Sequence, residues 1–257
     1  MCKFIYLNDI NSLMSEYGRK HRIERLYKDG KILIMAIDHG IPMGEQAGLY
    51  DIEGLIKKTY KDIDAVILNK GIIQTMDPKV LNKVELIYKL NGITSRAPNP
   101  YDLIMFTDIE ESISYDPVAV SYELYIGGEH EQRKLEELSR VIRQANKYDI
   151  PVISHIYPDR EEKNPEIISH CIRLGMELGT DIIKTFYFPG MRDQVLRTKR
   201  PIVIAGGERM QNPDNVLNYV KNAMESGASG IAMGRNLWGW NDKTPEIVKN
   251  VSRIVHK

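Results

Sequence analysis

The sequence predicts a single-domain α/β protein, a (β/α)8 or TIM barrel, and three observations lead to this expectation. The chain has 257 residues, close to the ~250 residues typical of one such barrel. Short apolar runs alternate with segments of helical periodicity along most of it. Several runs are almost continuously hydrophobic, which is typical of parallel strands covered by helices on one side and by packed side chains on the other. Length alone would also allow two domains, so the order of elements carries the prediction of one domain over residues 1–257.

Eight apolar runs are the expected strands. Each is followed by a small or polar break, and helical segments separate most of them. That order favours a closed barrel over an open sheet. The expected strands are residues 32–37, 65–68, 85–90, 118–124, 151–156, 181–186, 201–205 and 229–233.

The helical segments are clearest in the second half of the chain. Residues 132–147, 165–178 and 215–226 carry apolar side chains at the spacing of an amphipathic helix. Gly179 follows the second of these and is expected to cap its carboxyl end. Between residues 70 and 117 the third and fourth units are hard to delimit. Residues 1–30 are expected to form a helix that caps the base of the barrel.

The composition is that of an ordinary globular protein, with 42% hydrophobic and 27% charged residues. Lysines plus arginines number 35, and so do aspartates plus glutamates. A broad basic surface for nucleic acid is therefore not expected, and any attraction of an anionic substrate must be local.

The two cysteines, Cys2 and Cys171, give neither a metal-ligand spacing nor a disulfide framework. Cys171 lies in a helical run and is expected to be a small buried hydrophobe. The first residues lack the apolar core of a signal peptide, and no run approaches the ~20 residues of a membrane span. We expect a cytoplasmic protein that does not bind a membrane.

In a parallel barrel the active site gathers where the strands end and the following loops begin. At those positions this sequence concentrates ionisable side chains and glycines, which predicts a pocket there. They are Asp38-His39-Gly40, Lys70-Gly71, Glu123, Tyr157-Pro158, Lys184, Gly206-Gly207 and Gly234-Arg235-Asn236.

Lys184 lies in a run otherwise suited to a buried strand. Burial lowers the pKa of a lysine, and a neutral amine can attack a carbonyl to form an iminium that accepts electrons when a carbon–carbon bond breaks. The alternative is a structural lysine that pairs with a carboxylate or extends to the solvent. Lys70 and Glu123 could pair with each other or with Lys184.

Three further residues could move protons. Tyr157 ends the expected fifth strand, next to the strand of Lys184, and a phenol held against a substrate hydroxyl can exchange a proton with it. Asp38 ends the first strand and could relay protons or stabilise the protonated amine, or else cap the next segment. His39 could contact the substrate as a second proton carrier, or serve only in packing.

A phosphate site is predicted from the turns after the last two strands. Gly206-Gly207 and Gly234-Arg235 stand where loops of such barrels commonly bind phosphate through backbone N–H groups. Glycine lets the backbone approach the anion closely, and Arg235 could add a charge-assisted hydrogen bond.

The same residues carry a family resemblance. The segments AIDHG, LNKG, YP, PEIISHCIRLGMELGTDIIKTFY, IAGG and SGIAMGRNLW occur in that order. From about residue 31 to the carboxyl terminus, the chain resembles archaeal-type class I aldolases of the DeoC/FbaB/LacD family. That family includes fructose-bisphosphate aldolase and 2-amino-3,7-dideoxy-D-threo-hept-6-ulosonate synthase.

The resemblance implies a TIM barrel with Lys184 as the Schiff-base lysine, Tyr157 as general acid/base and Asp38 as its helper. It also implies phosphate binding by Gly206, Gly207, Gly234 and Arg235. It implies no metal and no organic cofactor, because the lysine does the work that zinc does in the other class of aldolases. Members of the family often form homo-oligomers, decamers among them.

The sequence departs from the family pattern at four places near the expected pocket. Asp159-Arg160 follows Tyr157-Pro158 where the family usually has Arg-Gly, and residues 187–190 read Tyr-Phe-Pro-Gly where it tends to have Tyr-Thr-Gly-Asp. His155 stands where fructose-bisphosphate aldolases tend to carry tryptophan, and Glu123 where a histidine is sometimes found. These changes bear on the substrate more than on the chemistry.

The leading hypothesis is a class I aldolase that cleaves fructose 1,6-bisphosphate to dihydroxyacetone phosphate and glyceraldehyde 3-phosphate, in glycolysis or gluconeogenesis. The segments Lys89–Gly92 and Asn236–Trp238 tilt the choice slightly toward this substrate. An alternative keeps the Schiff base in a transaldolase-like 2-amino-3,7-dideoxy-D-threo-hept-6-ulosonate synthase, or in a thiolase-like transfer on another sugar phosphate. A second alternative needs no lysine chemistry: an isomerase or binding barrel for phosphorylated metabolites, with Lys184 as a charge contact.

Overall fold

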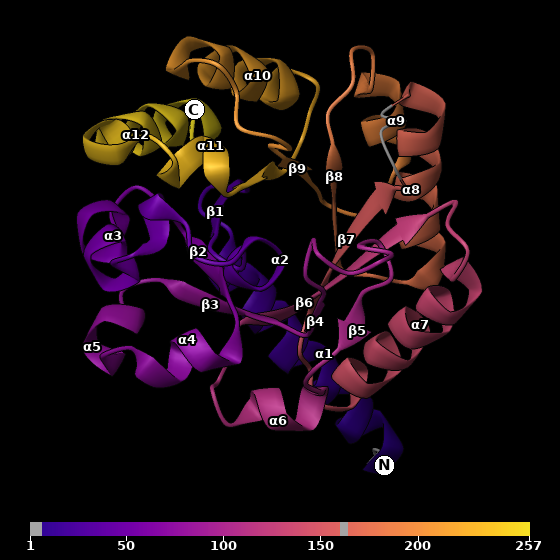
Figure 1. The fold of residues 1–257 in the computed structure, drawn as a ribbon. Coiled ribbons are helices and arrows are strands. Elements are labelled where there is room, and N and C mark those ends of the chain that lie inside the picture. The colour runs from indigo at the N-terminus through magenta and orange to yellow at the C-terminus, as the bar shows by residue number, and fades with distance from the viewer. Residues whose placement is uncertain (1–6, 160–163) are drawn as a thin grey trace.

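The structure, a computed structural model, describes the backbone of residues 7–159 and 164–257, and their side chains from residue 17 onward. Its centre is a closed barrel of eight parallel strands in which each strand pairs with its neighbours in sequence (Figure 1). The predicted TIM barrel is therefore confirmed. The barrel strands are β1 Ile32–Ala36, β2 Ala65–Leu68, β3 Glu85–Lys89, β6 Ala119–Ile126, β7 Val152–Pro158, β8 Ile182–Phe186, β9 Ile202–Ala205 and β10 Gly230–Met233.

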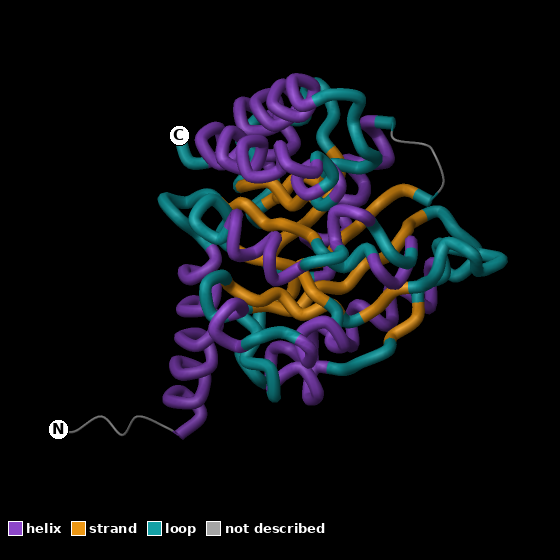
Figure 2. The backbone as a smooth tube through the Cα atoms, turned by 60° about the vertical axis from the view of Figure 1, so that its left-hand side comes forward, coloured by secondary structure: helices purple, strands orange, loops and turns teal. Residues whose placement is uncertain are grey.

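Helices surround the strands, and the tube view shows the strands enclosed by them (Figure 2). The longer helices are α1 Leu7–Leu26, α3 Ile52–Thr59, α7 Glu131–Lys147, α8 Pro165–Leu178, α10 Pro213–Glu225 and α12 Thr244–Val255. The shorter ones are α2 Gly40–Met43, α4 Lys70–Thr75, α5 Pro78–Leu81, α6 Ile109–Ile113, α9 Arg192–Arg197, α11 Arg235–Trp238, and the 3₁₀ turns Ala47–Leu49 and Asn241–Lys243.

Local sequence explains where α8 begins and ends. The Asn164 side chain accepts a hydrogen bond from the Ile167 amide, and Pro165 occupies the first turn, where a missing N–H costs nothing. Gly179 ends the helix at φ 84°, in the left-handed region that glycine adopts without strain. Both the predicted helix and its glycine cap are confirmed. Cys171 on this helix is fully buried, as expected.

The stretch that sequence periodicity did not delimit contains several short elements. Residues 70–117 hold α4, α5, β3 and α6, and a two-stranded antiparallel ribbon of β4 (Asn91–Gly92) and β5 (Ile104–Met105). The ribbon rises beside the carboxyl end of β3 and is not part of the barrel. Short helices and an inserted ribbon give no sustained period, which is why the pattern failed there.

The second half of α1 contacts the amino-terminal ends of the barrel strands. Arg19 donates a hydrogen bond to the Ile150 carbonyl and pairs with Asp181 at 3.1 Å, and Leu26 is fully buried with the lower interior of the barrel. These contacts support the proposal that residues 1–30 cap the base. Residues 1–6 of that segment lie outside the described residues.

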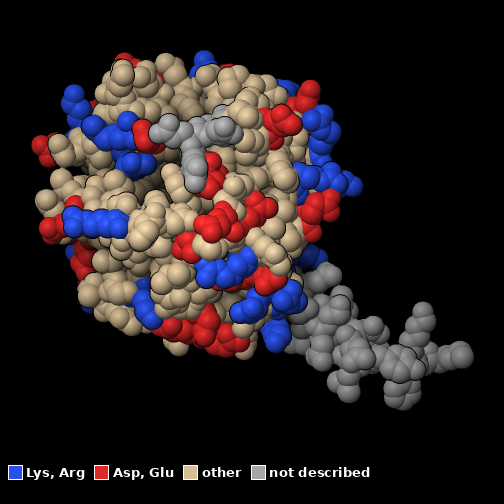
Figure 3. Space-filling view, turned by 45° about the vertical axis from the view of Figure 1, so that its right-hand side comes forward, with Lys and Arg blue, Asp and Glu red and all other residues tan. Residues whose placement is uncertain are grey.

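The surface mixes charges of both signs. On the face that Figure 3 shows, lysines and arginines are interspersed with aspartates and glutamates rather than gathered in one region. None of the helices within residues 7–159 and 164–257 combines the length and the apolar character needed to cross a bilayer.

Candidate active site

A pocket opens at the carboxyl ends of the barrel strands, where the sequence predicted it. Its volume is about 250 Å³. The candidate residues Asp38, His39, Glu123, Tyr157, Lys184, Gly206, Gly207, Gly234 and Arg235 all line it, and so do Asn69, Lys89, Asn91 and Tyr125.

Strand alternation explains why these side chains meet. Successive residues of a strand point to opposite faces, so every second residue enters the barrel. Ile153 and Ile182 lie in the apolar lower interior, and the residues two positions further along are His155 and Lys184. Each of these strands therefore carries an apolar side chain at the base of the barrel and an ionisable one above it.

Lys184 is the central candidate, and its side chain is buried. Burial lowers the pKa of its ammonium to about 8; Lys89 acts in the same direction, while the Asp38 and Glu123 carboxylates oppose it. Among the described residues, the structure records no ion pair or hydrogen bond for the Lys184 ammonium. The alternative of a lysine locked in a structural ion pair is therefore not what the geometry shows.

Lys89 is a site residue that our sequence reasoning missed. Its side chain is 4% exposed, and its Nζ lies 2.6 Å from Glu123 Oε2 and 3.5 Å from Asp38 Oδ2. A signal was present in the sequence, because Lys89 lies in the expected strand 85–90 just as Lys184 lies in the strand 181–186. Lys89 also follows Ile87, an interior residue, by two positions.

Glu123 lies in the middle of a strand and not at its end, because β6 continues to Ile126. Its carboxylate accepts a hydrogen bond from Tyr125 Oη at 2.9 Å and lies 3.5 Å from His155 Nδ1. Burial alone would raise the Glu123 pKa, but the charge of Lys89 and the contact with His155 hold it well below its ordinary value. Glu123 is therefore ionised at neutral pH.

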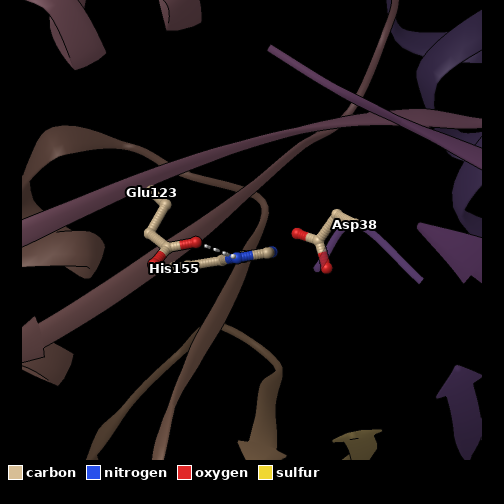
Figure 4. A group of neighbouring side chains, drawn as sticks. All are labelled: Asp38, Glu123 and His155. Carbon is tan, nitrogen blue, oxygen red and sulfur yellow. Dashed lines mark ion pairs between the residues drawn. The ribbon is translucent and has the colours of Figure 1, made fainter. Parts of the chain in front are cut away.

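Asp38, from the turn after β1, converges with Glu123 of β6 and His155 of β7 (Figure 4). Each offers one oxygen or nitrogen atom, and these atoms lie within 4.8 Å of one another. Such donors could hold a cation, but the Lys89 ammonium already lies against both carboxylates. The arrangement is that of a network organised around an internal lysine.

Tyr157 faces the pocket from β7, the neighbour of β8. Its ring stacks on Phe186, with centroids 4.8 Å apart, and lies 5.7 Å from the ring of Tyr125. Burial, with the nearby Glu123 charge, raises the pKa of the phenol well above its ordinary value. Tyr157 is thus a protonated hydroxyl that lines the same pocket as Lys184 and is suited to proton exchange with a bound hydroxyl group.

Asp38 and His39 enter the pocket together after β1. Burial raises the pKa of Asp38, but Lys89 first, then His39 and Lys184, hold it below its ordinary value. Burial lowers the pKa of His39, so the imidazole is neutral near pH 7. Its Nδ1 lies 3.5 Å from Asp38 and its ring meets Trp238 edge-on at 5.2 Å, which fits a packing and orienting role.

The two glycine-bearing turns form one connected unit. Asn236, almost fully buried, donates hydrogen bonds to the carbonyls of Gly206 and Glu208, and Arg235 donates one to the Gly207 carbonyl at 3.0 Å. Gly207 has φ 66°, which favours glycine. A Cβ atom on Gly206 would lie 2.8 Å from the Asn236 amide, so a larger residue would push these turns apart.

Lys70 does not take part in this network. Its ammonium pairs with Glu111 at 2.9 Å, on α6. The expectation that Lys70 pairs with Glu123 or with Lys184 is wrong, because Lys70 begins α4 and its ammonium is bound by Glu111 and by the Phe106 carbonyl. Arg160, one of the departures from the family pattern, lies outside the described residues.

Part of the pocket lining is an apolar wall. Its residues come from α2 and from the segment around the β4–β5 ribbon, and they are Ile41, Pro42, Met43, Ile93, Pro100 and Leu103. The Ser95 amide donates to the Pro42 carbonyl at 2.9 Å, which joins the two segments. Arg96 belongs to the same loop but is exposed and does not line the pocket, so among the described residues that line this wall there is no lysine or arginine.

Ion pairs on its outer side hold the wall in place. Asp102 lies between Pro100 and Leu103 in this loop. Its carboxylate is 3.3 Å from the ammonium of Lys134 on α7, whose side chain is only 2% exposed. Asp102 also pairs with Arg133. The ring of Tyr101 packs against Tyr125 with centroids 4.9 Å apart.

The chain is similar in sequence to known aldolases and synthases over most of its length. A family model described as DeoC/LacD family aldolase matches residues 32–239. The chain is 32% identical over 240 residues to 2-amino-3,7-dideoxy-D-threo-hept-6-ulosonate synthase 1 of Archaeoglobus fulgidus, covering 93% of this chain and 91% of the relative. It is also 32% identical over 227 residues to fructose-bisphosphate aldolase class 1 of Thermoproteus tenax, covering 83% and 85%.

The chain also resembles a solved structure. An archaeal fructose-1,6-bisphosphate aldolase, solved with its catalytic lysine covalently bound to the carbinolamine intermediate of its substrate, superposes with a TM-score of 0.84 at 29% identity. The match covers 93% of this chain and 100% of that one. The similarity thus extends over nearly the whole of both chains.

Proposed function

This chain belongs to the DeoC/LacD family of aldolases, and from that premise we propose that it makes or breaks a carbon–carbon bond of a phosphorylated ketose through a Schiff base on Lys184. The observation that carries the proposal is the environment of Lys184. A buried amine with a lowered pKa and no counter-ion among the described residues opens into a pocket beside a protonated phenol. That combination suits nucleophilic attack on a carbonyl followed by proton transfer.

In the cleavage direction, neutral Lys184 attacks the C2 carbonyl of the ketose and forms a carbinolamine. Loss of water gives the iminium. The positive charge of the iminium favours ionisation of Tyr157, whose phenol proton passes to solvent. The phenolate Oη then takes the proton of the C4 hydroxyl as the C3–C4 bond breaks, which releases an aldehyde and leaves the electron pair of that bond as the enamine on Lys184. Protonation of the enamine at C3 and addition of water then free the ketone and regenerate the amine. Asp38 faces this nitrogen and stabilises its cationic forms.

The substrate phosphate is assigned to the glycine turns. Gly206, Gly207, Gly234 and Arg235 line the pocket together, and Arg235 is held by the Gly207 carbonyl. An anion bound there would contact a guanidinium and the backbone of both turns.

Incubation with dihydroxyacetone phosphate, reduction with sodium borohydride and peptide mass spectrometry test the proposal. We expect a ligand-sized adduct on the peptide that carries Lys184. An adduct on another lysine would move the site, and the absence of any adduct with both dihydroxyacetone phosphate and fructose 1,6-bisphosphate would contradict the Schiff base.

Fructose 1,6-bisphosphate is the first substrate to test, because relatives and solved structures bear the name of its aldolase. A 2-amino-3,7-dideoxy-D-threo-hept-6-ulosonate synthase reaction is the second candidate, after the Archaeoglobus fulgidus relative. The apolar wall favours the second, since a bisphosphate needs a second anion site and the described wall carries no basic side chain. Product analysis with phosphorylated and unphosphorylated aldehydes distinguishes them.

We also propose that the chain forms a homo-oligomer, whose mass light scattering coupled to gel filtration would measure. A cytoplasmic location and a role in sugar phosphate metabolism belong to the same proposal.

A further inference from the structure

The Lys184 amine has no counter-ion among the described residues, although two ionised carboxylates influence it. Asp38 and Glu123 both act on the Lys184 ammonium electrostatically. Neither is recorded within ion-pair distance of it. A buried ammonium normally acquires a carboxylate partner, because an unpaired buried charge is costly. Another group must therefore bind the Asp38 and Glu123 carboxylates and keep them from pairing with the Lys184 ammonium.

Lys89 lies where it can bind both carboxylates. Its Nζ lies 2.6 Å from Glu123 Oε2 and 3.5 Å from Asp38 Oδ2, and its side chain is buried. The other oxygen of Glu123 accepts the hydrogen bond of Tyr125. Asn91 fixes the backbone of Glu123 from both sides, since its side chain donates to the Glu123 carbonyl and accepts from the Glu123 amide. The carboxylate is thereby turned toward Lys89.

We propose that Lys89 is a positioning residue that binds the carboxylates of Asp38 and Glu123 and so keeps the Lys184 amine available to attack a carbonyl. Lys89 touches no reacting atom in this role. It acts through the carboxylates, and by the repulsion between its own charge and that of a protonated Lys184. The inference rests on the proposed Schiff-base function of Lys184.

The charges that face Lys184 come from every side of the pocket. They belong to the turn after β1, to β3, β6 and β7, and to the start of α11 after β10, and the groups are Asp38, His39, Lys89, Glu123, His155, Tyr157 and Arg235. The two histidines and the tyrosine are neutral near pH 7, because burial lowers the pKa of each imidazole and raises that of the phenol.

Arg235 is also charged, but it is present in every variant and does not alter the comparison. The charges that act on the pKa of Lys184 are those of Asp38, Lys89 and Glu123, which together present one net negative charge. Without Lys89 they would present two, and a carboxylate could turn to pair with the Lys184 ammonium. Without the charge of Glu123 they would present none. Replacing Lys89 and Glu123 together would leave one, as in the wild-type protein.

The test is the pH dependence of Schiff-base trapping. The full-length protein is incubated with dihydroxyacetone phosphate and sodium cyanoborohydride from pH 5 to 10, and the initial rate of adduct formation on Lys184 is measured by mass spectrometry. For Lys89→Met we expect the midpoint of the curve of initial rate against pH to move up by about one pH unit, so that trapping at pH 7 is about tenfold slower. For Lys89→Met/Glu123→Gln we expect it to return close to the wild-type midpoint.

Further variants separate this effect from lost folding. Glu123→Gln alone is expected to move the midpoint down, and it serves if Lys89→Met does not fold. Lys89→Arg is expected to keep the wild-type midpoint. Lys70→Met removes a lysine that lies outside the pocket and is paired with Glu111, and it is expected to leave the midpoint where it is.

Two results would overturn the inference. One is a Lys89→Met protein that traps more slowly by the same factor at every pH, since a purely structural role lowers the rate without moving its midpoint. The other is a Glu123→Gln midpoint that stays at the wild-type value. If the wild-type protein forms no adduct on Lys184 at any pH, the proposed function itself fails, which is a different outcome from either.

Discussion

His155 and Lys184 are cross-strand neighbours, paired in register on β7 and β8 and both buried in the barrel. Burial first, and then the charges of Lys184 and Lys89, lower the pKa of His155 to about 3. The imidazole is therefore neutral at every pH at which the protein is expected to work. A neutral ring beside Lys184 adds no positive charge to a site that must form an iminium.

The wild-type protein should form its Schiff base faster as the pH rises toward 8. Only the neutral amine of Lys184 attacks a carbonyl, and its pKa is lowered to about 8. The initial trapping rate should rise about tenfold per pH unit well below that value and level off above it. A rate that is independent of pH between 6 and 9 would contradict this titration.

Lys184→Met should abolish turnover, with a loss of at least about 10³-fold, because thioether sulfur cannot form an imine. The variant should fold, since methionine fits an apolar interior and removes a buried charge. Steady-state kinetics and thermal denaturation measure the two effects. Lys184→Arg is the control that keeps the charge, and activity retained by it would favour the non-covalent binding barrel instead.

Tyr157→Phe should separate Schiff-base formation from carbon–carbon cleavage. The ring that stacks on Phe186 is kept, while the hydroxyl that exchanges the proton is lost. We expect kcat to fall by about 10²- to 10⁴-fold, the usual range for a general acid/base. Borohydride trapping on Lys184 should persist. Loss of trapping and turnover in equal measure would assign Tyr157 an earlier step.

Arg235→Ala should weaken binding of the phosphate with less effect on the chemistry. The guanidinium lines the pocket and is oriented by the Gly207 carbonyl. One charge-assisted contact is worth about 1.5–3 kcal/mol, which corresponds to a rise in KM of roughly 10- to 150-fold. Trapping with dihydroxyacetone phosphate should suffer, whereas trapping with unphosphorylated dihydroxyacetone should not. Equal loss with both ketones would place the phosphate elsewhere.

Arg19→Ala should test the capping role of α1. Arg19 pairs with Asp181, which is 5% exposed and accepts the Val152 amide, so its loss leaves a buried carboxylate without its partner. We expect a loss of about 1–3 kcal/mol in the free energy of unfolding at pH 7, measured by chemical denaturation.

The pH dependence of that loss has a definite sign. Burial raises the pKa of Asp181 in the folded protein, so this group opposes folding once the pH exceeds its unfolded value and stops doing so as it becomes protonated. The deficit of Arg19→Ala should therefore shrink as the pH falls toward 4. Arg25→Ala is the matched control, because Arg25 and Glu85 are both partly exposed, and should cost less than about 1 kcal/mol.

Much of the barrel could be read from the sequence. The eight apolar runs correspond to the eight barrel strands, and α8 spans the predicted residues 165–178 and ends at the predicted Gly179 cap. Such features are local, since strand burial, helical period and capping depend on residues close together in the chain. The predicted pocket residues also follow from local position, because the carboxyl ends of all barrel strands meet at one face.

Only the tertiary structure decided which charges face one another. Lys70 follows β2 and Lys89 ends β3. The Lys70 side chain pairs with Glu111, whereas the Lys89 side chain enters the barrel between Asp38 and Glu123. Those partners lie 34 or more residues from Lys89, and sequence distance carries no information on such pairs. Barrel closure and the two-residue alternation of its strands bring them together, because closure sets which strands adjoin and alternation sets which side chains point inward.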